Sequence, residues 1–222
     1  MRGVIFDMDG VLVLTGRHHY EAWRRAAARD GIDLTYEFFT HTFGRTNPDT
    51  IAMIWGEQGR GAVPAERAAE IAAFKEETFR AMVRGDVPLA PGARELLTSL
   101  AEAGLTLAIG SSAPRENLDL IVDAARIRVF FASIVDGSMV TRGKPAPDVF
   151  LLAAHAAGLR PGACVVVEDA PVGIRAALAA GMQAVGVATT HPAEELHAAG
   201  AREVVPALSG LSVAGIAQIV GR

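Results

Sequence analysis

The sequence has little of several residue types, and each shortage excludes a class of protein. Its one cysteine, Cys164, cannot form a disulfide within the chain and fits a reducing compartment. No run of eighteen apolar residues occurs, so we expect no membrane-spanning helix and no membrane partner. Arg2 is followed at once by strand-like residues and acids. We therefore expect no signal peptide, and a cytoplasmic protein.

An excess of charge of one sign is also missing. The chain has 21 Lys and Arg against 25 Asp and Glu, a formal net charge of −4. This balance predicts no nucleic-acid partner and no attraction to an anionic membrane. Half of the 222 residues are hydrophobic. A chain of this length can bury about 70% of its unfolded surface, which predicts a globular protein, and we expect a monomer.

Short apolar runs rich in β-branched residues alternate with helical patterns along most of the chain. Such runs cover both faces of a buried strand, and their alternation with helices is typical of a parallel sheet. We therefore predict an α/β fold, an open Rossmann-like parallel sheet with helices on both faces. The expected strands are 3–6, 105–109, 132–135, 164–167, 184–187 and 203–205, and the expected helices are 93–103, 116–125, 148–157, 174–180 and 193–200.

The stretch from about 15 to 86 breaks this alternation, because it contains helical patterns and no strand pattern. The expected helices are 18–31, 35–44, 48–59 and 64–83. The simplest interpretation is a small all-α cap domain, 15–87, inserted after the first strand of a catalytic core formed by 1–14 and 88–222. We expect the cap over the carboxyl ends of the strands, where open α/β folds bind ligands.

Polar residues follow four of the predicted strands. Because the carboxyl ends of parallel strands share one edge of the sheet, these residues should meet there. Four carboxylates, one lysine and two hydroxyls would gather in one place. They are Asp7 and Asp9 in VIFDMDGVL, Ser111 and Ser112 in GSSAP, Lys144 in RGKPAP, and Glu168 and Asp169 in VVVEDAP.

This collection of side chains is typical of phosphoryl chemistry. Carboxylate oxygens are the ligands that Mg²⁺ prefers, and Mg²⁺ keeps substrate phosphate in its coordination shell. A lysine and a helix start rich in hydroxyls and free N–H groups favour a phosphate anion. Asp7 could then act as a nucleophile, and Asp9 as general acid and base. We expect a small phosphorylated metabolite as the substrate.

Four motifs carry a resemblance that covers essentially the whole chain: DMDGVL (7–12), GSSAPRENL (110–118), GKPAPDVF (143–150) and VVVEDAPVGI (165–174). The sequence resembles the haloacid dehalogenase-like phosphatase superfamily, in the group with a helical cap. The resemblance implies Asp7 as nucleophile and Asp9 as general acid/base. It also implies Ser111 and Lys144 as phosphate ligands, and Mg²⁺ held by Asp7, the Asp9 carbonyl and Asp169 with Glu168 in support. Ser112 is either a second phosphate ligand or a helix cap.

Within this superfamily the chain is similar to the β-phosphoglucomutase and sugar-phosphate phosphatase branch. His19 and Lys75 fall where the mutases have a histidine near the general acid/base and a substrate-binding cap lysine. Asn47 falls where the mutases have a phosphate-binding arginine, although Arg45 is only two residues away. As generic surface groups, all four could equally be solvated or paired on the cap.

The missing arginine favours hydrolysis of a sugar phosphate, and phosphoglucomutase activity is the main alternative. A haloacid dehalogenase is disfavoured because such enzymes lack an acid two residues after the nucleophile. A non-catalytic phosphate sensor is disfavoured because no catalytic acid has been lost.

Overall fold

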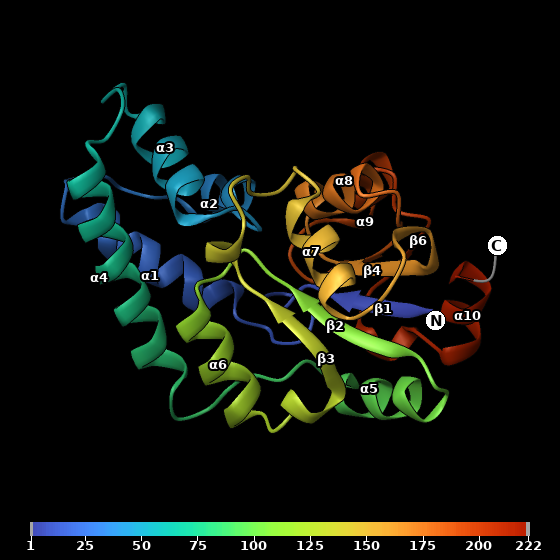
Figure 1. The fold of residues 1–222 in the computed structure, drawn as a ribbon. Helices are drawn as coiled ribbons and strands as arrows, with labels where there is room; N and C mark the ends of the chain where they lie inside the picture. The colour runs from blue at the N-terminus through green and yellow to red at the C-terminus, as the bar shows by residue number, and fades with distance from the viewer. Residues whose placement is uncertain (1, 221–222) are drawn as a thin grey trace.

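Six parallel strands form one sheet in the computed structural model, which describes residues 2–220 (Figure 1). The order across the sheet is β3-β2-β1-β4-β5-β6, so the first strand lies in the middle, between β2 and β4. The direction of strand progression reverses at β1, and such switch points are where open α/β sheets bind ligands. The strands are β1 (Gly3–Phe6), β2 (Thr106–Gly110), β3 (Phe131–Val135), β4 (Cys164–Glu168), β5 (Gln183–Val187) and β6 (Glu203–Val205).

Helices cover both faces of the sheet, because successive strand side chains point to opposite sides. On β1, Val4 and Phe6 enter one hydrophobic cluster and Ile5 enters the other. Residues of α5 (Ala93–Glu102), α6 (Arg115–Ala124) and α10 (Val213–Val220) belong to the first cluster, and residues of α7 (Asp148–Ala156), α8 (Pro171–Ala179) and α9 (Ala193–Ala198) to the second. The predicted Rossmann-like α/β fold is confirmed.

The element boundaries differ from the predicted ones by one to three residues at most ends, and one helix was missed. The missed element is α10, whose sequence VAGIAQIV has one polar residue and so shows no contrast between a polar and an apolar helix face. Short 3₁₀ turns were also not predicted: η1 (Arg128–Phe130), η2 (Gly137–Met139), η3 (Pro161–Ala163) and η4 (Leu208–Gly210).

Four helices follow β1 and form what we call the cap: α1 (Gly16–Ala28), α2 (Tyr36–Thr42), α3 (Asn47–Glu57) and α4 (Ala65–Val83). They have a hydrophobic cluster of their own, which includes Trp23, Phe39 and Trp55. The hydroxyls of Thr35 and Thr46 accept hydrogen bonds from the first turns of α2 and α3, which fixes where these helices begin. In Figure 1 the cap stands on the side to which the strand arrows point.

The two connections between cap and core run side by side. The Leu14 amide donates to the Pro88 carbonyl at 2.8 Å, and the Ala90 amide donates to the Leu12 carbonyl at 2.9 Å. These hydrogen bonds hold the two connecting segments next to each other, as a hinge between two units requires. The boundaries 15 and 87 remain a prediction.

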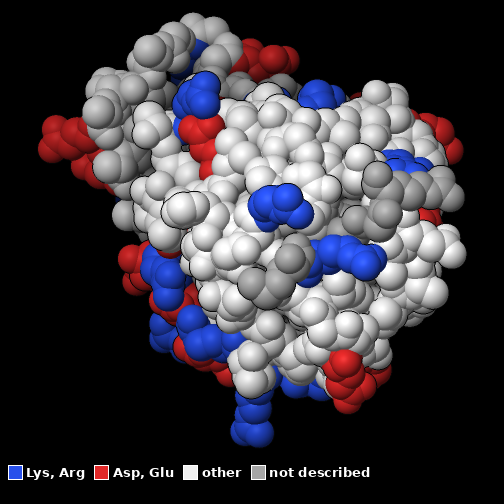
Figure 2. All heavy atoms as spheres, turned by 45° about the vertical axis from the view of Figure 1, so that its right-hand side comes forward, with Lys and Arg blue, Asp and Glu red and all other residues white. Residues whose placement is uncertain are grey.

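The surface carries charges of both signs. On the face in Figure 2, acidic and basic side chains are interspersed and no patch of one sign gathers. No helix among the described residues is long and apolar enough to cross a membrane. The absence of a nucleic-acid partner, the monomeric state and the cytoplasmic location remain predictions.

Candidate active site

A buried lysine links two of the predicted acids. Lys144 Nζ donates to Asp7 Oδ1 at 2.6 Å and to Glu168 Oε1 at 2.7 Å, and all three side chains are almost fully inaccessible. Burial raises the pKa of Asp7 to about 7; Lys144 opposes this shift, whereas Glu168 and Asp9 add to it. One ammonium group therefore does not fully compensate this group of carboxylates.

Asp169 completes the acidic group and has little local compensation. Both of its carboxylate oxygens are buried and make no hydrogen bond of good geometry, and of the side chains around them Thr190 and Lys144 lower the pKa of Asp169. Burial, followed by the neighbouring Glu168 and Asp7, raises its pKa well above the ordinary value. Gly10 has φ +88°, and a Cβ there would lie 1.9 Å from Asp169 Oδ2, so the DxDG turn needs glycine.

These observations fit a bound cation. Carboxylates buried in excess over cations, one of them without a hydrogen bond of good geometry, are stabilised when a divalent ion lies between them. Asp7 and Asp169 would supply carboxylate oxygens for Mg²⁺, and Asp9 a backbone carbonyl. Glu168 accepts hydrogen bonds from Lys144 and the Ala170 amide, which suits a supporting position. Within residues 2–220 no group of three or more His, Cys, Asp and Glu side chains is arranged to hold a metal.

The two serines after β2 have different environments. Ser111 is buried beside the cavity that Asp7 and Asp9 line, and its hydroxyl accepts a hydrogen bond from the Ala113 amide. The Ser112 hydroxyl instead donates to the Gly44 carbonyl of the cap at 2.9 Å. Ser111 thus lies at this cavity, whereas the hydroxyl of Ser112 contributes a cap–core contact.

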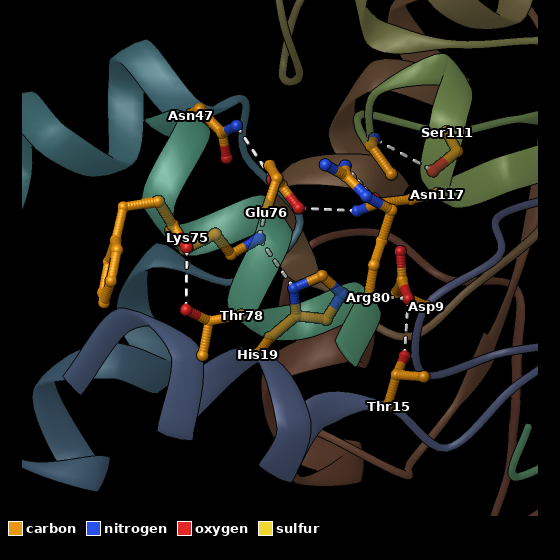
Figure 3. A network of polar contacts seen from close by, with 12 residues as sticks. Asp9, Thr15, His19, Asn47, Lys75, Glu76, Thr78, Arg80, Ser111 and Asn117 are labelled. Atoms are coloured by element: carbon orange, nitrogen blue, oxygen red, sulfur yellow. Dashed lines mark hydrogen bonds and ion pairs between the residues drawn. The ribbon is translucent and has the colours of Figure 1, made fainter. Parts of the chain in front are cut away.

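Asp9 is held by two residues of the cap's first helix and its N-cap (Figure 3). The Thr15 hydroxyl donates to Asp9 Oδ1 at 2.5 Å, and His19 Nε2 lies 3.0 Å from the same oxygen. Burial alone would raise the pKa of Asp9, but His19 and Thr15 hold it below the ordinary value. Burial and Lys75 lower the pKa of His19, so the ring is neutral at pH 7.

The proton of that neutral ring can be placed from its neighbours. Lys75 Nζ lies 2.9 Å from His19 Nδ1, and an ammonium group can only donate. His19 Nδ1 therefore accepts, and the ring proton is on Nε2, facing Asp9. The predicted proximity of His19 to Asp9 is a feature of the structure.

Lys75 and Asn47, both predicted to bind substrate, are bound to protein groups. Lys75 is 2% exposed, and its ammonium donates to Glu76 Oε1 at 2.8 Å. Asn47 Nδ2 donates to the same oxygen at 2.8 Å. Figure 3 shows Asn47, Glu76 and Lys75 pointing toward one another. Both still line the cavity, but the ammonium of Lys75 and the amide of Asn47 already donate to Glu76.

Arg45 lines the catalytic cavity as well, and its Nε is buried without a hydrogen-bond partner. The cavity has a volume of about 50 Å³ and lies between cap and core. A neighbouring cleft of about 630 Å³ lies between the start of α3 and the loop that carries Lys144, and it shares Arg45, Asn47 and Ser112 with the cavity.

The sequence interpretation missed three polar residues near Asp9 or the cap lysine: Thr15, Glu76 and Asn117. Thr15 could have been found, since it precedes His19 by four residues and so shares its helix face. Glu76 is adjacent to Lys75 in the charged stretch FKEETF, where an exposed helical charge is the ordinary expectation. No local signal marks Asn117, which is 41 residues from its partner Glu76.

The comparisons with known proteins agree with this geometry. Residues 1–181 match the model of the haloacid dehalogenase-like hydrolases. The chain belongs to the haloacid dehalogenase-like hydrolase family. It is therefore an enzyme of this family, which confirms the resemblance stated from its motifs.

The proteins that this chain resembles include a phosphatase and a phosphomutase. The chain is 34% identical to the plasmid-encoded protein CbbY of Cupriavidus necator (88% of this chain, 81% of CbbY). It is 33% identical to hexitol phosphatase A of Escherichia coli (84% and 82%). The crystal structure of β-phosphoglucomutase from Clostridium difficile superposes with a TM-score of 0.91 at 26% identity, covering 100% and 97% of the two chains. The family thus includes phosphatases and a phosphomutase of nearly the same shape.

Proposed function

We propose that this protein is a Mg²⁺-dependent phosphatase that hydrolyses a small sugar phosphate through an aspartyl-phosphate on Asp7. The observation that carries the proposal is the placement of two carboxylates with different partners on one cavity. Asp7 accepts a hydrogen bond from Lys144 and lies among the buried acids of the core, where a bound cation would keep it ionised as a nucleophile requires. Asp9 lies against Thr15 and His19 of the cap, which orient its carboxyl group for proton transfer.

In the first half-reaction, an Asp7 carboxylate oxygen attacks phosphorus, and the bond from phosphorus to the sugar oxygen breaks. Lys144 and Ser111 hold the phosphoryl oxygens. Because the pKa of Asp9 is lowered here, Asp9 must take up a proton before this step, and it then gives that proton to the leaving oxygen while His19 and Thr15 fix the orientation of its carboxyl group. Bound Mg²⁺ would neutralise Asp7 and Asp169 and draw charge from the phosphoryl group.

In the second half-reaction, Asp9 removes a proton from water, whose oxygen attacks phosphorus. The bond to Asp7 breaks and phosphate is released, so Asp9 has regained the proton that it gave. The cavity of about 50 Å³ is far smaller than an ordinary ligand site of roughly 300 Å³ or more. The cap must therefore open to admit a sugar phosphate, and closure then excludes bulk water.

The hydrogen bond from Asn47 to Glu76 supports hydrolysis over mutase activity. A mutase must hold a second phosphate at the far end of the sugar, and the amide of Asn47 donates to Glu76 instead. The cap side of the cavity also carries the carboxylate of Glu76, which disfavours a second phosphate there. A hydroxyl-rich end, as in a hexitol or pentose monophosphate, suits these groups better.

One observation favours the mutase as the second candidate. The buried, unpartnered Nε of Arg45 lies at the cavity and could bind a distal phosphate in place of the missing arginine.

The decisive experiment supplies Mg²⁺ and β-glucose 1-phosphate with a trace of the bisphosphate, and assays glucose 6-phosphate and free phosphate together. Phosphate release without isomerisation supports the phosphatase, and a panel of hexitol and pentose phosphates then finds the preferred substrate. Rapid isomerisation with little phosphate release would establish the mutase, and Arg45→Ala should then abolish it. Reactions with EDTA serve as the control for the metal.

A further inference from the structure

Glu76 is a buried carboxylate that the proposed reaction does not use. It is 5% exposed, and its two oxygens accept three hydrogen bonds from three different elements. Oε1 accepts from Lys75 on the same helix and from Asn47 at the start of α3, and Oε2 accepts from Asn117 of the core at 2.6 Å. Burial alone would raise its pKa, but Lys75 and His19 hold it below the ordinary value, so Glu76 is ionised.

Asn117 is the core residue in this contact, and both polar atoms of its side-chain amide are hydrogen-bonded. Its Nδ2 donates to Glu76, and its Oδ1 accepts from Arg80 at 3.1 Å. Glu76 and Arg80 are four residues apart, so they lie one turn apart on the same face of α4. Asn117 itself is 0% exposed. Figure 3 shows α4 meeting Asn117 through these two side chains.

The same carboxylate connects to the proposed general acid/base. From Glu76 the contacts continue through Lys75 to His19 and from His19 to Asp9, each between 2.8 and 3.0 Å. Three of these residues belong to the cap and Asp9 to the core. The position of the His19 imidazole against Asp9 therefore depends on the position of α4 relative to the core. Asn117 is the core residue that hydrogen-bonds to α4 here.

We propose that Glu76 and Asn117 are positioning residues: their contact latches the closed cap to the core and so sets His19 against Asp9. This inference deepens the proposed function and rests on it. Because the closed cavity is too small for a sugar phosphate, the latch must release and re-form in each turnover. A polar contact suits this use, since water satisfies both partners when the cap is open.

Exchanging the carboxylate of Glu76 and the amide of Asn117 between the two positions tests this contact directly. In Glu76→Gln the side chain has one oxygen for Lys75 and Asn47, and its amide then faces the Asn117 amide, donor against donor. In Asn117→Asp two carboxylates oppose each other. The double variant carries both changes, so the new glutamine accepts from Lys75 and Asn47 through its oxygen. Its amide donates to the new aspartate, which also accepts from Arg80. The net charge is unchanged and each hydrogen-bond donor again faces an acceptor, while the negative charge moves from the Lys75 side of the contact to the Arg80 side.

The first readout separates positioning from a general loss of structure. With a sugar phosphate, we expect each single variant to lower kcat by about 100-fold, the effect of breaking a buried charged contact. With p-nitrophenyl phosphate, whose leaving group needs no proton, the burst of p-nitrophenolate should change by about threefold or less. The double variant should recover most of the lost kcat. Glu77→Gln, the same change at the adjacent exposed position, is the control.

The second readout does not depend on activity. Backbone amides of α4 and of residues 43–47 should exchange hydrogen faster in both single variants, and the double variant should restore the wild-type rate. Wild-type protein that releases no phosphate from any substrate, yet follows this exchange pattern, would overturn the proposed function and leave the latch in place. A double variant no better than the worse single variant in exchange would overturn the latch.

Discussion

Among residues 2–220, a cluster of buried charge in the core and another in the cap differ in how far their charges are balanced. In the core, Asp7, Glu168 and Asp169 share the single ammonium of Lys144, and Asp169 makes no hydrogen bond of good geometry. In the cap, the carboxylate of Glu76 neutralises the charge of the Lys75 ammonium and also accepts hydrogen bonds from the side-chain amides of Asn47 and Asn117. A buried cluster that is short of positive charge is built for a cation and a reaction, whereas a balanced one holds its parts in place.

The largest expected effect is on the chemistry of the core cluster. Asp7→Asn removes the nucleophile and should lower kcat by about 10⁴-fold or more, since no other group can form the phosphorylated intermediate. Phosphate release under saturating Mg²⁺ measures it, and circular dichroism checks the fold. Asp33→Asn, at an exposed site, should behave as wild type. A fully active Asp7→Asn protein would exclude the aspartyl-phosphate mechanism.

The second prediction compares the two lysines. Lys144→Met leaves Asp7 and Glu168 buried without a cation and should lower the free energy of unfolding by about 3–5 kcal/mol. Lys75→Met leaves Glu76 with both amide donors and should cost less, about 1–3 kcal/mol. Urea unfolding in EDTA measures both variants. Equal losses would mean that the two clusters do not differ in balance as described.

The third prediction concerns pH in metal-free protein. A carboxyl group whose pKa is raised from 3.8 to about 7 binds its proton more tightly in the folded state. Asp7 therefore contributes stability below pH 3.8 that is lost as the pH rises through 7, on the order of 4 kcal/mol. Glu76, with its lowered pKa, has the opposite sign: its contribution is present above pH 4.5 and is lost as the pH falls further.

Urea unfolding in EDTA across pH 3 to 8 tests these signs. Relative to wild type, Asp7→Asn should gain stability as the pH rises from about 4 to 7. Glu76→Gln should lose its disadvantage as the pH falls below about 4.5. If both differences had the same sign of slope, the contrast between the clusters would be wrong.

The smallest expected effect is that of the metal on stability. If Mg²⁺ binds the core cluster, Mg²⁺ at 100 times its Kd should raise the free energy of unfolding by about 2.7 kcal/mol. Thermal unfolding with Mg²⁺ and with EDTA measures the shift. Asp169→Asn should abolish this shift, and Glu76→Gln should retain it. A shift of wild-type size in Asp169→Asn would place the ion elsewhere.

Prediction from sequence succeeded where local pattern and parallel-sheet geometry were enough. Asp7, Ser111 and Glu168 each stand at or just after the end of a strand, so their meeting at one sheet edge followed from the strand pattern. The α/β fold followed from the same pattern. The prediction of α10 failed because its residues are almost all apolar and show no polar face. Asn117 was missed because its partner Glu76 comes from a different part of the chain.

The sequence by itself determined the sheet, the acids at its carboxyl edge and the family of the chain, because these depend on short motifs and on the order of strands. Only the tertiary structure decided how the cap residues are used. Lys75 and Asn47 have side chains that could bind a substrate. In the structure both donate hydrogen bonds to Glu76, which α4 places against Asn117 of the core. A buried carboxylate must accept hydrogen bonds, and its donors are the groups that tertiary packing places next to it. Local sequence patterns do not predict which distant segments pack together.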